Sequence, residues 1–189
     1  MASTKERIMD TTAGLFQRYG YTGTGLKQIV ASANAPFGSI YHHFPNGKAQ
    51  LGEEVIRHSG RMYRELFEAI FAAAPDVETA TSDFFLGAAE TLRQTDYADA
   101  CPIETVALEV ASTNEPLRKA TAEVFESWIA AGTERFRAAG LSAHEARGLT
   151  IVFLSALEGA FVLCRASKTT EALEAAGAHM TAAVREAVT

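Results

Sequence analysis

The sequence predicts an all-α protein, and three observations support this fold class. Apolar residues recur at spacings of three and four along almost the whole chain, which is the pattern of one buried helix face. No segment alternates convincingly between apolar and polar residues with the period of two typical of strands. Short breaks rich in Gly, Pro, Asn and Asp separate the helical patterns. With 189 residues, 48% of them hydrophobic, the chain can bury a core in one domain or two.

The first helix is predicted to begin at Ser3. Ser3 and Glu6 have the three-residue spacing of a reciprocal N-terminal cap. Gly20 can end the helix with a positive φ, which glycine adopts without strain. The face expected to pack inward holds Ile8, Thr12, Leu15, Phe16 and Tyr19.

Two short helices follow, one after Thr24 and one from about residue 36 to 44. Asn34 lies in the turn between them and tolerates the positive φ that such a turn often needs. Pro36 fits the first turn of the later helix, where a missing N–H costs little. The residues expected to face inward are Leu26, Ile29, Val30 and Ala33 in one helix, and Ile40 and Phe44 in the other.

Longer helices are predicted after the break Pro45-Asn46-Gly47. The fourth helix begins near Lys48 and carries an apolar stripe. Because helix length changes at this point, we place a domain boundary here, between residues 1–47 and residues 48–189. The stripe consists of Leu51, Val55, Ser59, Met62, Leu66 and Ile70, and further helices are expected at about 77–94, 103–113, 116–139, 143–166 and 170–187.

Charge is distributed unevenly along the chain. The formal net charge is −6, yet residues 1–50 hold five basic against two acidic side chains, and the remainder holds 12 basic against 21 acidic. A basic N-terminal region on an acidic body suits a protein whose N-terminal end alone approaches phosphates. Such a balance over 50 residues also arises by chance, so the charge pattern supports this interpretation without deciding it.

The two short helices joined by a tight turn have the layout of a helix-turn-helix, in which the second helix enters the major groove of DNA. With Ile40 and Phe44 facing inward, hydroxyl and imidazole groups remain on the outer face, where they can bond phosphates or base edges. A glycine on that face would let the backbone come close to DNA. The outer residues are Phe37, Gly38, Ser39, Tyr41, His42 and His43.

Three further residues are candidates for phosphate contacts. Thr24 can cap the helix that follows it, and the N-terminal amides of that helix, together with Lys27, can anchor a phosphate. Lys48, at the start of the fourth helix, can hold a phosphate on the other side of the groove. Double-stranded DNA is therefore the partner that this region predicts.

One pattern extends from the end of the first predicted helix through the two short helices. It consists of Phe16, Tyr19-Gly20-Tyr21, Ile29, Ala33 and the run from Gly38 to Pro45. With these residues the segment 21–48 resembles the DNA-binding domain of the tetracycline repressor (TetR) family. The resemblance implies a homodimer that grips a palindromic operator and is released by a small-molecule effector bound in its C-terminal domain. The family's contact positions fall on Thr24, Lys27, Phe37, Ser39, Tyr41, His42 and His43.

The sequence departs from that family's pattern at four points. Gly25 stands where the family usually has Ser or Thr, and Asn34 where it usually has Gly. Pro36-Phe37 replaces a common Ser-Lys or Ser-Arg. Lys48 follows Phe44 by four residues where three is usual, which puts its phosphate contact in question.

Two further runs carry a narrower resemblance. They are the turn Pro45-Asn46-Gly47-Lys48 and the run Cys101-Pro102-Ile103, which leads into Ala107-Leu108-Glu109. Both are similar to repressors of the LmrA and YxaF type, which control drug-resistance genes. Repression, as opposed to activation, is implied by the resemblance alone.

The C-terminal region is rich in aromatic residues. They can line an apolar pocket for a small apolar or aromatic effector, and a helical core would use the same residues for packing. Glu158 lies inside an apolar run, where it is either a buried carboxylate that needs a partner or a residue at a helix edge. Cys101 is either a redox or electrophile sensor or a quiet buried thiol. The candidate effector-binding residues are Phe71, Phe84, Tyr97, Cys101, Trp128, Glu158 and Phe161.

The last two predicted helices are the expected dimer contact. Both carry apolar residues at seam spacing, with small residues that permit close approach. Two such helices from each subunit make a four-helix bundle across a twofold axis. The alternative is that both helices complete the core of one subunit. The seam residues are Leu149, Val152, Phe153, Ala156, Leu157, Ala160, Phe161 and Cys164, then Leu173, Ala176, Met180, Val184 and Ala187.

Other classes of function find less support in the sequence. His42 and His43 are adjacent, so they point about a hundred degrees apart on a helix and rarely bind one metal ion. No catalytic triad, metal cluster or phosphate loop indicates an enzyme, and no cofactor is expected. A polar N-terminus and the lack of a long apolar run predict a cytoplasmic protein without a membrane span. The remaining alternatives are an enzyme built into the helical bundle and an interaction module whose helix-turn-helix no longer reads DNA.

Overall fold

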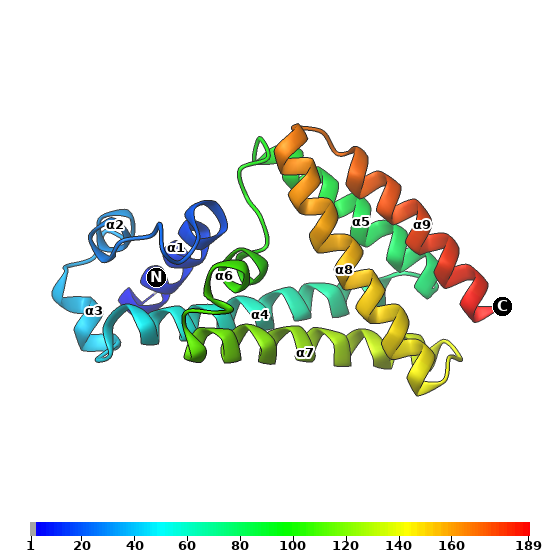
Figure 1. Ribbon diagram of the computed structural model, residues 1–189, viewed down its shortest axis with the longest axis horizontal. Coiled ribbons are helices and arrows are strands. Elements are labelled where there is room, and N and C mark those ends of the chain that lie inside the picture. Colours follow the sequence, from blue (N-terminus) through cyan, green and yellow to red (C-terminus); the bar gives the residue numbers. More distant parts are fainter. Residues whose placement is uncertain (1–2) are drawn as a thin grey trace. The chain divides into compact units, whose positions relative to one another are not determined.

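The computed structural model describes residues 3–189. Across these residues the chain forms nine α-helices and no β-strand (Figure 1), which confirms the predicted all-α fold class. The helices are α1 (Thr4–Tyr19), α2 (Leu26–Ser32), α3 (Gly38–His43), α4 (Gly47–Ala73), α5 (Val77–Gln94), α6 (Pro102–Val110), α7 (Glu115–Ala138), α8 (Ala143–Ser167) and α9 (Glu171–Val188).

The chain forms two compact units, which are described separately. The first unit contains the residues up to Arg61 and the segment Cys101–Val124, and the second contains Met62–Ala100 and Phe125–Thr189. α6 therefore belongs with the first three helices although it follows α5 in sequence, and α4 and α7 each contribute to both units. The boundary predicted between residues 47 and 48 stays a prediction.

The N-terminus of α1 is capped as the sequence predicts. The Ser3 hydroxyl accepts a hydrogen bond from the Glu6 N–H at 3.2 Å, and the Glu6 carboxylate accepts one from the Ser3 N–H at 2.7 Å. At the other end Gly20 has a φ of +69° and donates its N–H to the Phe16 carbonyl at 3.0 Å. On the predicted inner face Ile8, Thr12 and Phe16 are fully buried, Leu15 is half-buried, and Tyr19, in the last turn, is exposed.

The turn between α2 and α3 depends on Asn34 and Pro36. Asn34 has a φ of +47°, as predicted. α3 begins at Gly38 rather than near residue 36, because the preceding residues form a tighter turn in which the Ser39 N–H donates to the Pro36 carbonyl at 2.9 Å. Of the residues predicted to face inward, Ile29, Val30, Ala33, Ile40 and Phe44 are buried and Leu26 is half-buried.

The predicted capping of α2 by Thr24 is wrong. The N-cap residue is Gly25, which makes no side-chain cap hydrogen bond. Thr24 is fully buried, and its hydroxyl donates to the Gly20 carbonyl at 2.7 Å, at the C-terminal end of α1. The hydroxyl therefore closes the loop between α1 and α2 instead of accepting a bond from the first amides of α2.

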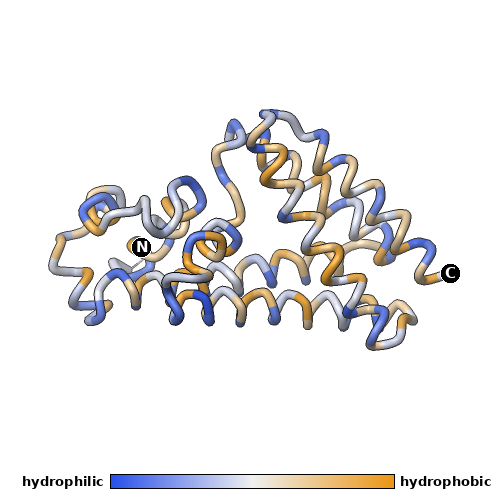
Figure 2. Tube along the Cα trace, viewed as in Figure 1, coloured by the Kyte–Doolittle hydropathy of each residue, from blue (hydrophilic) through white to orange (hydrophobic). Residues whose placement is uncertain are grey.

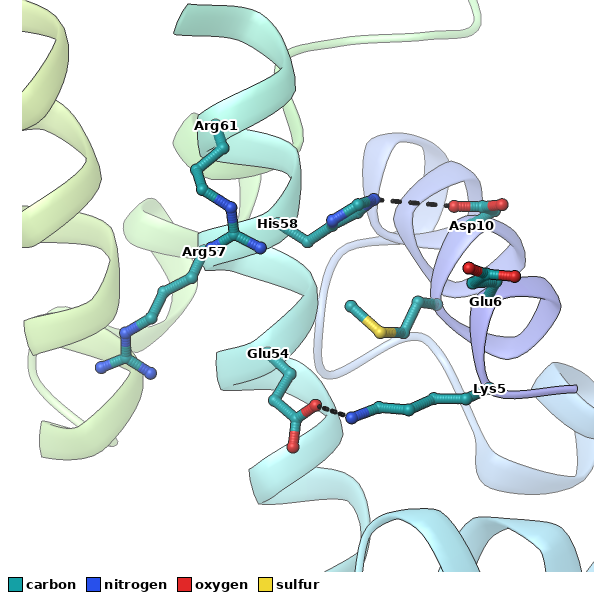
Figure 3. Close-up of a pocket in the computed structure, with 8 residues that line it drawn as sticks. Lys5, Glu6, Asp10, Glu54, Arg57, His58 and Arg61 are labelled. Carbon is teal, nitrogen blue, oxygen red and sulfur yellow. Dashed lines mark ion pairs between the residues drawn. The ribbon is translucent and has the colours of Figure 1, made fainter. Parts of the chain in front are cut away.

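Within the first unit, charged side chains connect α1 to α4 (Figure 3). Lys5 pairs with Glu54 at 2.8 Å, and the Asp10 carboxylate lies 3.9 Å from Nε2 of His58. Between these contacts lies an open groove of about 410 Å³ whose walls carry side chains of both charges. α1, against which α2, α3 and α6 pack, is thus connected to α4 by these polar contacts.

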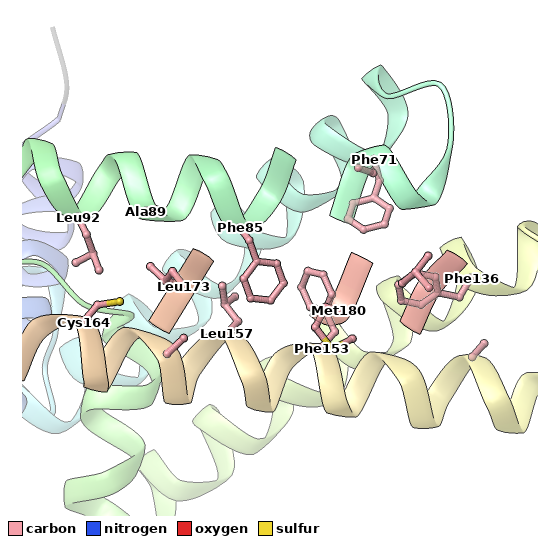
Figure 4. Packing of buried hydrophobic residues seen from close by; sticks show 14 of the residues in the cluster. Phe71, Phe85, Ala89, Leu92, Phe136, Phe153, Leu157, Cys164, Leu173 and Met180 are labelled. Atoms are coloured by element: carbon pink, nitrogen blue, oxygen red, sulfur yellow. The ribbon is translucent and has the colours of Figure 1, made fainter. Parts of the chain in front are cut away.

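The core of the second unit is built on phenylalanine (Figure 4). The ring centroid of Phe153 on α8 lies 5.1 Å from that of Phe85 on α5 and 6.4 Å from that of Phe71 on α4. α9 adds Met180 to the same core. Gly177 lets α9 approach α5 closely, because a Cβ at this position would lie 2.7 Å from Cβ of Phe85.

α8 carries apolar residues along much of its length (Figure 2). Within residues 3–189, α8 is the one helix that is long and apolar enough to cross a membrane. The core helices of soluble proteins also meet these two criteria of length and composition. Only 28% of its most apolar window is buried within the chain. α8 therefore presents an apolar face that its own unit does not cover, with Ile151, Val152, Val162 and Leu163 exposed on it.

Candidate nucleic-acid interface

α3 buries one side and exposes the other. Ile40 and Phe44 are fully buried, whereas Phe37, just before the helix, is 46% exposed and Tyr41 is 52% exposed. The rings of Phe37 and Tyr41 are neighbours, with centroids 6.2 Å apart. Most of the predicted outer residues thus face solvent. Of the others, Gly38 and His42 are exposed, and Ser39 and His43 are half-buried.

Gly38 leaves open space on this surface. A Cβ at position 38 would meet no atom within 4 Å apart from its own neighbours. The φ of Gly38 also lies outside the positive region that favours glycine. Neither the space around residue 38 nor its backbone conformation therefore requires glycine at this position.

The two histidines of α3 contact each other edge to face. The ring centroids of His42 and His43 lie 4.7 Å apart, and His43 also packs against Phe44 at 6.3 Å. Across residues 3–189 no group of three His, Cys, Asp or Glu side chains is placed to hold a metal ion. The imidazole groups of α3 are suited instead to hydrogen bonds with an external acceptor.

The two phosphate candidates on either side of the start of α2 differ in exposure. Lys27 is exposed on α2. Thr24 is enclosed, and its hydroxyl is occupied by the Gly20 carbonyl at 2.7 Å. In this conformation Lys27 can reach a phosphate, whereas Thr24 stabilises the loop that positions α2.

Lys48 lies against an aromatic ring of its own unit. Its Nζ is 4.3 Å from the ring centroid of Tyr21, and that ring packs edge-on against Phe16 at 5.7 Å. Partial burial lowers the pKa of the Lys48 ammonium, and the Glu109 carboxylate acts in the opposite direction. A cation over an aromatic face is worth about 0.5–2 kcal/mol, depending on its exposure. With its spacing of four residues from Phe44 instead of three, Lys48 thus contacts the Tyr21 ring. Its contact with a phosphate stays a prediction.

Glu109 ties α6 to the loop between α1 and α2. Its carboxylate accepts a hydrogen bond from the Thr22 N–H at 2.7 Å. It also lies so close to Gly20 that a Cβ there would collide with Oε1 of Glu109. Gly20 is thus required both for its positive φ and for this contact. Sequence reasoning did not find the role of Glu109, because 87 residues separate it from Thr22.

Two of the effector candidates lie in one aromatic cluster. Phe71 and Phe84 both contact Phe67, with ring centroids 4.2 Å and 5.7 Å apart. Phe84 also lies 5.6 Å from Phe153 and is half-buried, whereas Phe71 is 7% exposed. Burial favours core packing for Phe71 and leaves part of the Phe84 ring accessible.

The other effector candidates lie at separate places in their units. Trp128 on α7 packs against Tyr63 and Phe125, with ring centroids 6.3 Å and 5.7 Å away. Tyr97, after α5, lies under the ammonium of Lys168 at 5.6 Å. On α8 Glu158 is buried and Phe161 half-buried, and Cys101, in the first unit, accepts a hydrogen bond from the Glu104 N–H at 3.5 Å.

These features define a class of protein. A three-helix head contains two short helices joined by a tight turn, and the second of them faces solvent with hydroxyl, imidazole and aromatic groups. Long helices follow it, and one of them leaves an apolar face uncovered. This is the arrangement of a helix-turn-helix transcriptional regulator.

Comparison with known proteins gives the family. Residues 8–55 match the family "Bacterial regulatory proteins, tetR family", and residues 78–179 match "Transcriptional regulator LmrA/YxaF-like, C-terminal domain". The HTH-type transcriptional regulator YxaF of Bacillus subtilis is 34% identical over 164 residues, which cover 87% of this chain and 86% of YxaF. LmrA of the same organism is 31% identical, with 87% of each chain covered. The chain belongs to the TetR family of transcriptional regulators and to its LmrA/YxaF-like group.

Solved structures agree on the fold. A TetR transcriptional regulator from Legionella pneumophila superposes with a TM-score of 0.84 at 22% identity, covering 95% of this chain and 96% of that one. The regulatory protein TetR from Rhodobacter sphaeroides gives 0.83 at 21% identity, covering 93% and 96%. Because the chain belongs to the TetR family, it is a DNA-binding regulator and not an enzyme. Its family binds DNA operators as dimers and typically releases them in response to small molecules.

Substituting Gly38 by Ala separates folding from DNA binding. The new methyl group fits the chain and favours the helix, so the melting temperature is expected to stay unchanged or rise. Affinity for operator DNA is expected to fall at least several-fold, because Gly38 is exposed on the side of α3 that is predicted to approach the bases. Gly87→Ala on α5, where the space is equally open, is the matched control. Equal operator affinity of Gly38→Ala and the control would contradict this role for Gly38.

Proposed function

We propose that this protein is a homodimeric repressor that binds a palindromic operator with α3 of each subunit. It dissociates from the operator when a small apolar or aromatic effector binds its C-terminal domain. The observation that carries the proposal is the division of α3 into a buried apolar side and an exposed side. A solvent-facing helix of hydroxyl, imidazole and aromatic groups on a rigid head is suited to the major groove. We place the protein in the cytoplasm, where its DNA target lies.

The DNA contacts fall into two kinds. Tyr41 and His42 are exposed at the centre of the outer side of α3 and contact base edges or phosphates, with His43 and Ser39 beside them. Lys27 on α2 holds a phosphate on one side, and Lys48 does so on the other when it leaves the Tyr21 ring. Gly38 allows close approach at the start of the helix, beside the exposed ring of Phe37, and Thr24 supports the loop from within.

We place the dimer contact on the exposed sides of α8 and α9. Most of the predicted seam residues serve their own subunit instead, because Phe153, Leu157, Ala160, Cys164, Leu173, Met180 and Val184 are buried in the core of the second unit. A stripe of uncharged residues runs along the exposed side of α8 at spacings of three and four, which is the pattern of a helix–helix seam. Two of its glycines leave open space for a partner helix. An interface of this kind pairs the same face of two copies across a twofold axis. The stripe comprises Gly148, Val152, Ser155, Gly159, Leu163 and Ala166.

Effector release follows from linkage between two conformations. An effector shifts the equilibrium only by its preference for the state that does not fit DNA. In that state the two α3 helices no longer match major grooves about 34–36 Å apart. The candidates for effector contacts are the partly accessible aromatic rings of Phe84, Trp128 and Phe161, each suited to an apolar group, and the buried carboxylate of Glu158, suited to a polar group. α4 carries the change because its residues belong to both units.

Operator binding tests the assignment of α3. Fluorescence anisotropy with fragments of the DNA upstream of the gene should find one that binds tightly. Tyr41→Ala should weaken its binding about tenfold or more, since a good base contact is worth about 1–3 kcal/mol. Tyr19→Ala is the matched control, because Tyr19 is equally exposed, at 54%, but lies on α1. If Tyr41→Ala binds as tightly as Tyr19→Ala, α3 is not the reading element.

Sedimentation tests the dimer interface. Leu163→Arg places a charge on the proposed seam, so the protein is expected to become monomeric and to lose tight operator binding. Leu86→Arg on α5 changes a leucine of similar exposure and should leave the dimer intact. A Leu163→Arg protein that sediments as a dimer would show that the subunits meet elsewhere.

A thermal-shift screen of small aromatic compounds tests the effector. A compound that binds the native protein raises its melting temperature, by an amount that grows with concentration over Kd. At least one such compound is expected to lower operator affinity as well. If every stabilising compound leaves operator affinity unchanged, release by an apolar effector is ruled out for that class of compounds.

A further inference from the structure

The outer surface of α3 lacks the side chains that read bases by paired hydrogen bonds. Residues 35–45 contain no Arg, Lys, Asn, Gln, Asp or Glu. Guanine is most often read by Arg or Lys, adenine by Asn or Gln, and cytosine by Glu or Asp. This helix can therefore recognise bases only by single hydrogen bonds and by apolar contacts. The apolar group that a base pair presents in the major groove is the 5-methyl group of thymine.

Phe37 is placed to make such a contact. It stands immediately before α3, at the end of a recognition helix that approaches base edges. Almost half of its surface is exposed, although the chain has buried the other phenylalanine of this region, Phe44, completely. The neighbouring Gly38 leaves the space beside it open.

Tyr41 backs the Phe37 ring. It lies one helical turn further on, and the two ring centroids are 6.2 Å apart. The Tyr41 ring lies near Gly47, where an added Cβ would be 3.4 Å from Cε1 of Tyr41. The two rings are therefore exposed neighbours on the outer side of α3.

We propose that Phe37 recognises the 5-methyl group of a thymine in each operator half-site, with Tyr41 as the residue that positions its ring. This inference rests on the proposed function, in which α3 enters the major groove, and it names the base feature that the groove must present. Pro36-Phe37 stands where the family resemblance leads one to expect a Ser followed by a basic residue. The chain therefore exchanges a phosphate contact for an apolar contact that depends on sequence.

Replacing thymine by deoxyuridine tests the proposal, because it removes the methyl group and preserves base pairing. In a fragment that the wild-type protein binds, each thymine of a half-site is replaced singly. One replacement is expected to weaken wild-type binding about three- to tenfold, the scale of losing one buried methyl group. Phe37→Ala should bind the thymine and deoxyuridine fragments equally, and Tyr19→Ala should keep the wild-type preference.

Phe37→Lys provides a second variant, in case Phe37→Ala binds too weakly to measure. It supplies a phosphate contact, so it should bind measurably and lack the preference for thymine. Melting curves confirm that each variant is folded.

The outcomes separate this inference from the proposed function. If wild-type binding is insensitive to every replacement, or if both Phe37 variants keep the preference, Phe37 does not read a thymine methyl group, while operator binding itself stands. If the wild-type protein binds no upstream fragment, the proposed function fails and this inference fails with it.

Discussion

The apolar core shared by α1, α2 and α3 is the constraint on which the rest of the protein depends. Helices of seven and six residues are too short to be stable alone, so α2 and α3 exist because their apolar sides are buried. Phe16, Ile40 and Phe44 are fully buried in the first unit. Burial of Ile40 and Phe44 also fixes which side of α3 faces outward. The surface that we propose for DNA binding is therefore the remainder of α3, and the buried core determines how that surface is positioned.

Residues distant in sequence complete this head. The carboxylate of Glu109 on α6 holds the Thr22 N–H, and Thr24 closes the same loop from within. The segment before α6 is hydrogen-bonded within the second unit. Arg165 donates to the carbonyl of Ala98, and Lys168 donates to the carbonyl of Asp96. The loop that leads into α2 thus depends on α6. α6 begins shortly after Ala100, the last residue of the first stretch of the second unit. Together with α4 and α7, this segment is one of three places where the chain passes between the units.

Much of the fold could be predicted from the sequence, because its signals are local. The Ser3 cap, the positive φ of Asn34 and the bounds of the long helices each depend on residues a few positions apart. The predictions that failed or fell short concern contacts between distant residues. The Thr24 hydroxyl finds a carbonyl of α1 instead of an amide of α2. The Lys48 ammonium contacts the Tyr21 ring. No local sequence pattern indicates that the Glu109 carboxylate accepts a hydrogen bond from Thr22. For the effector candidates, apolar periodicity alone cannot separate a core ring such as Phe71 from a partly accessible one such as Phe84.

The central claim is that a dimer reads DNA with two copies of α3, and hydroxyl-radical footprinting of the DNA upstream of the gene tests it most directly. The account predicts two protected half-sites, related by a palindrome and centred one helical turn apart, about 34–36 Å. A single protected site, or protection that does not depend on sequence, would contradict it.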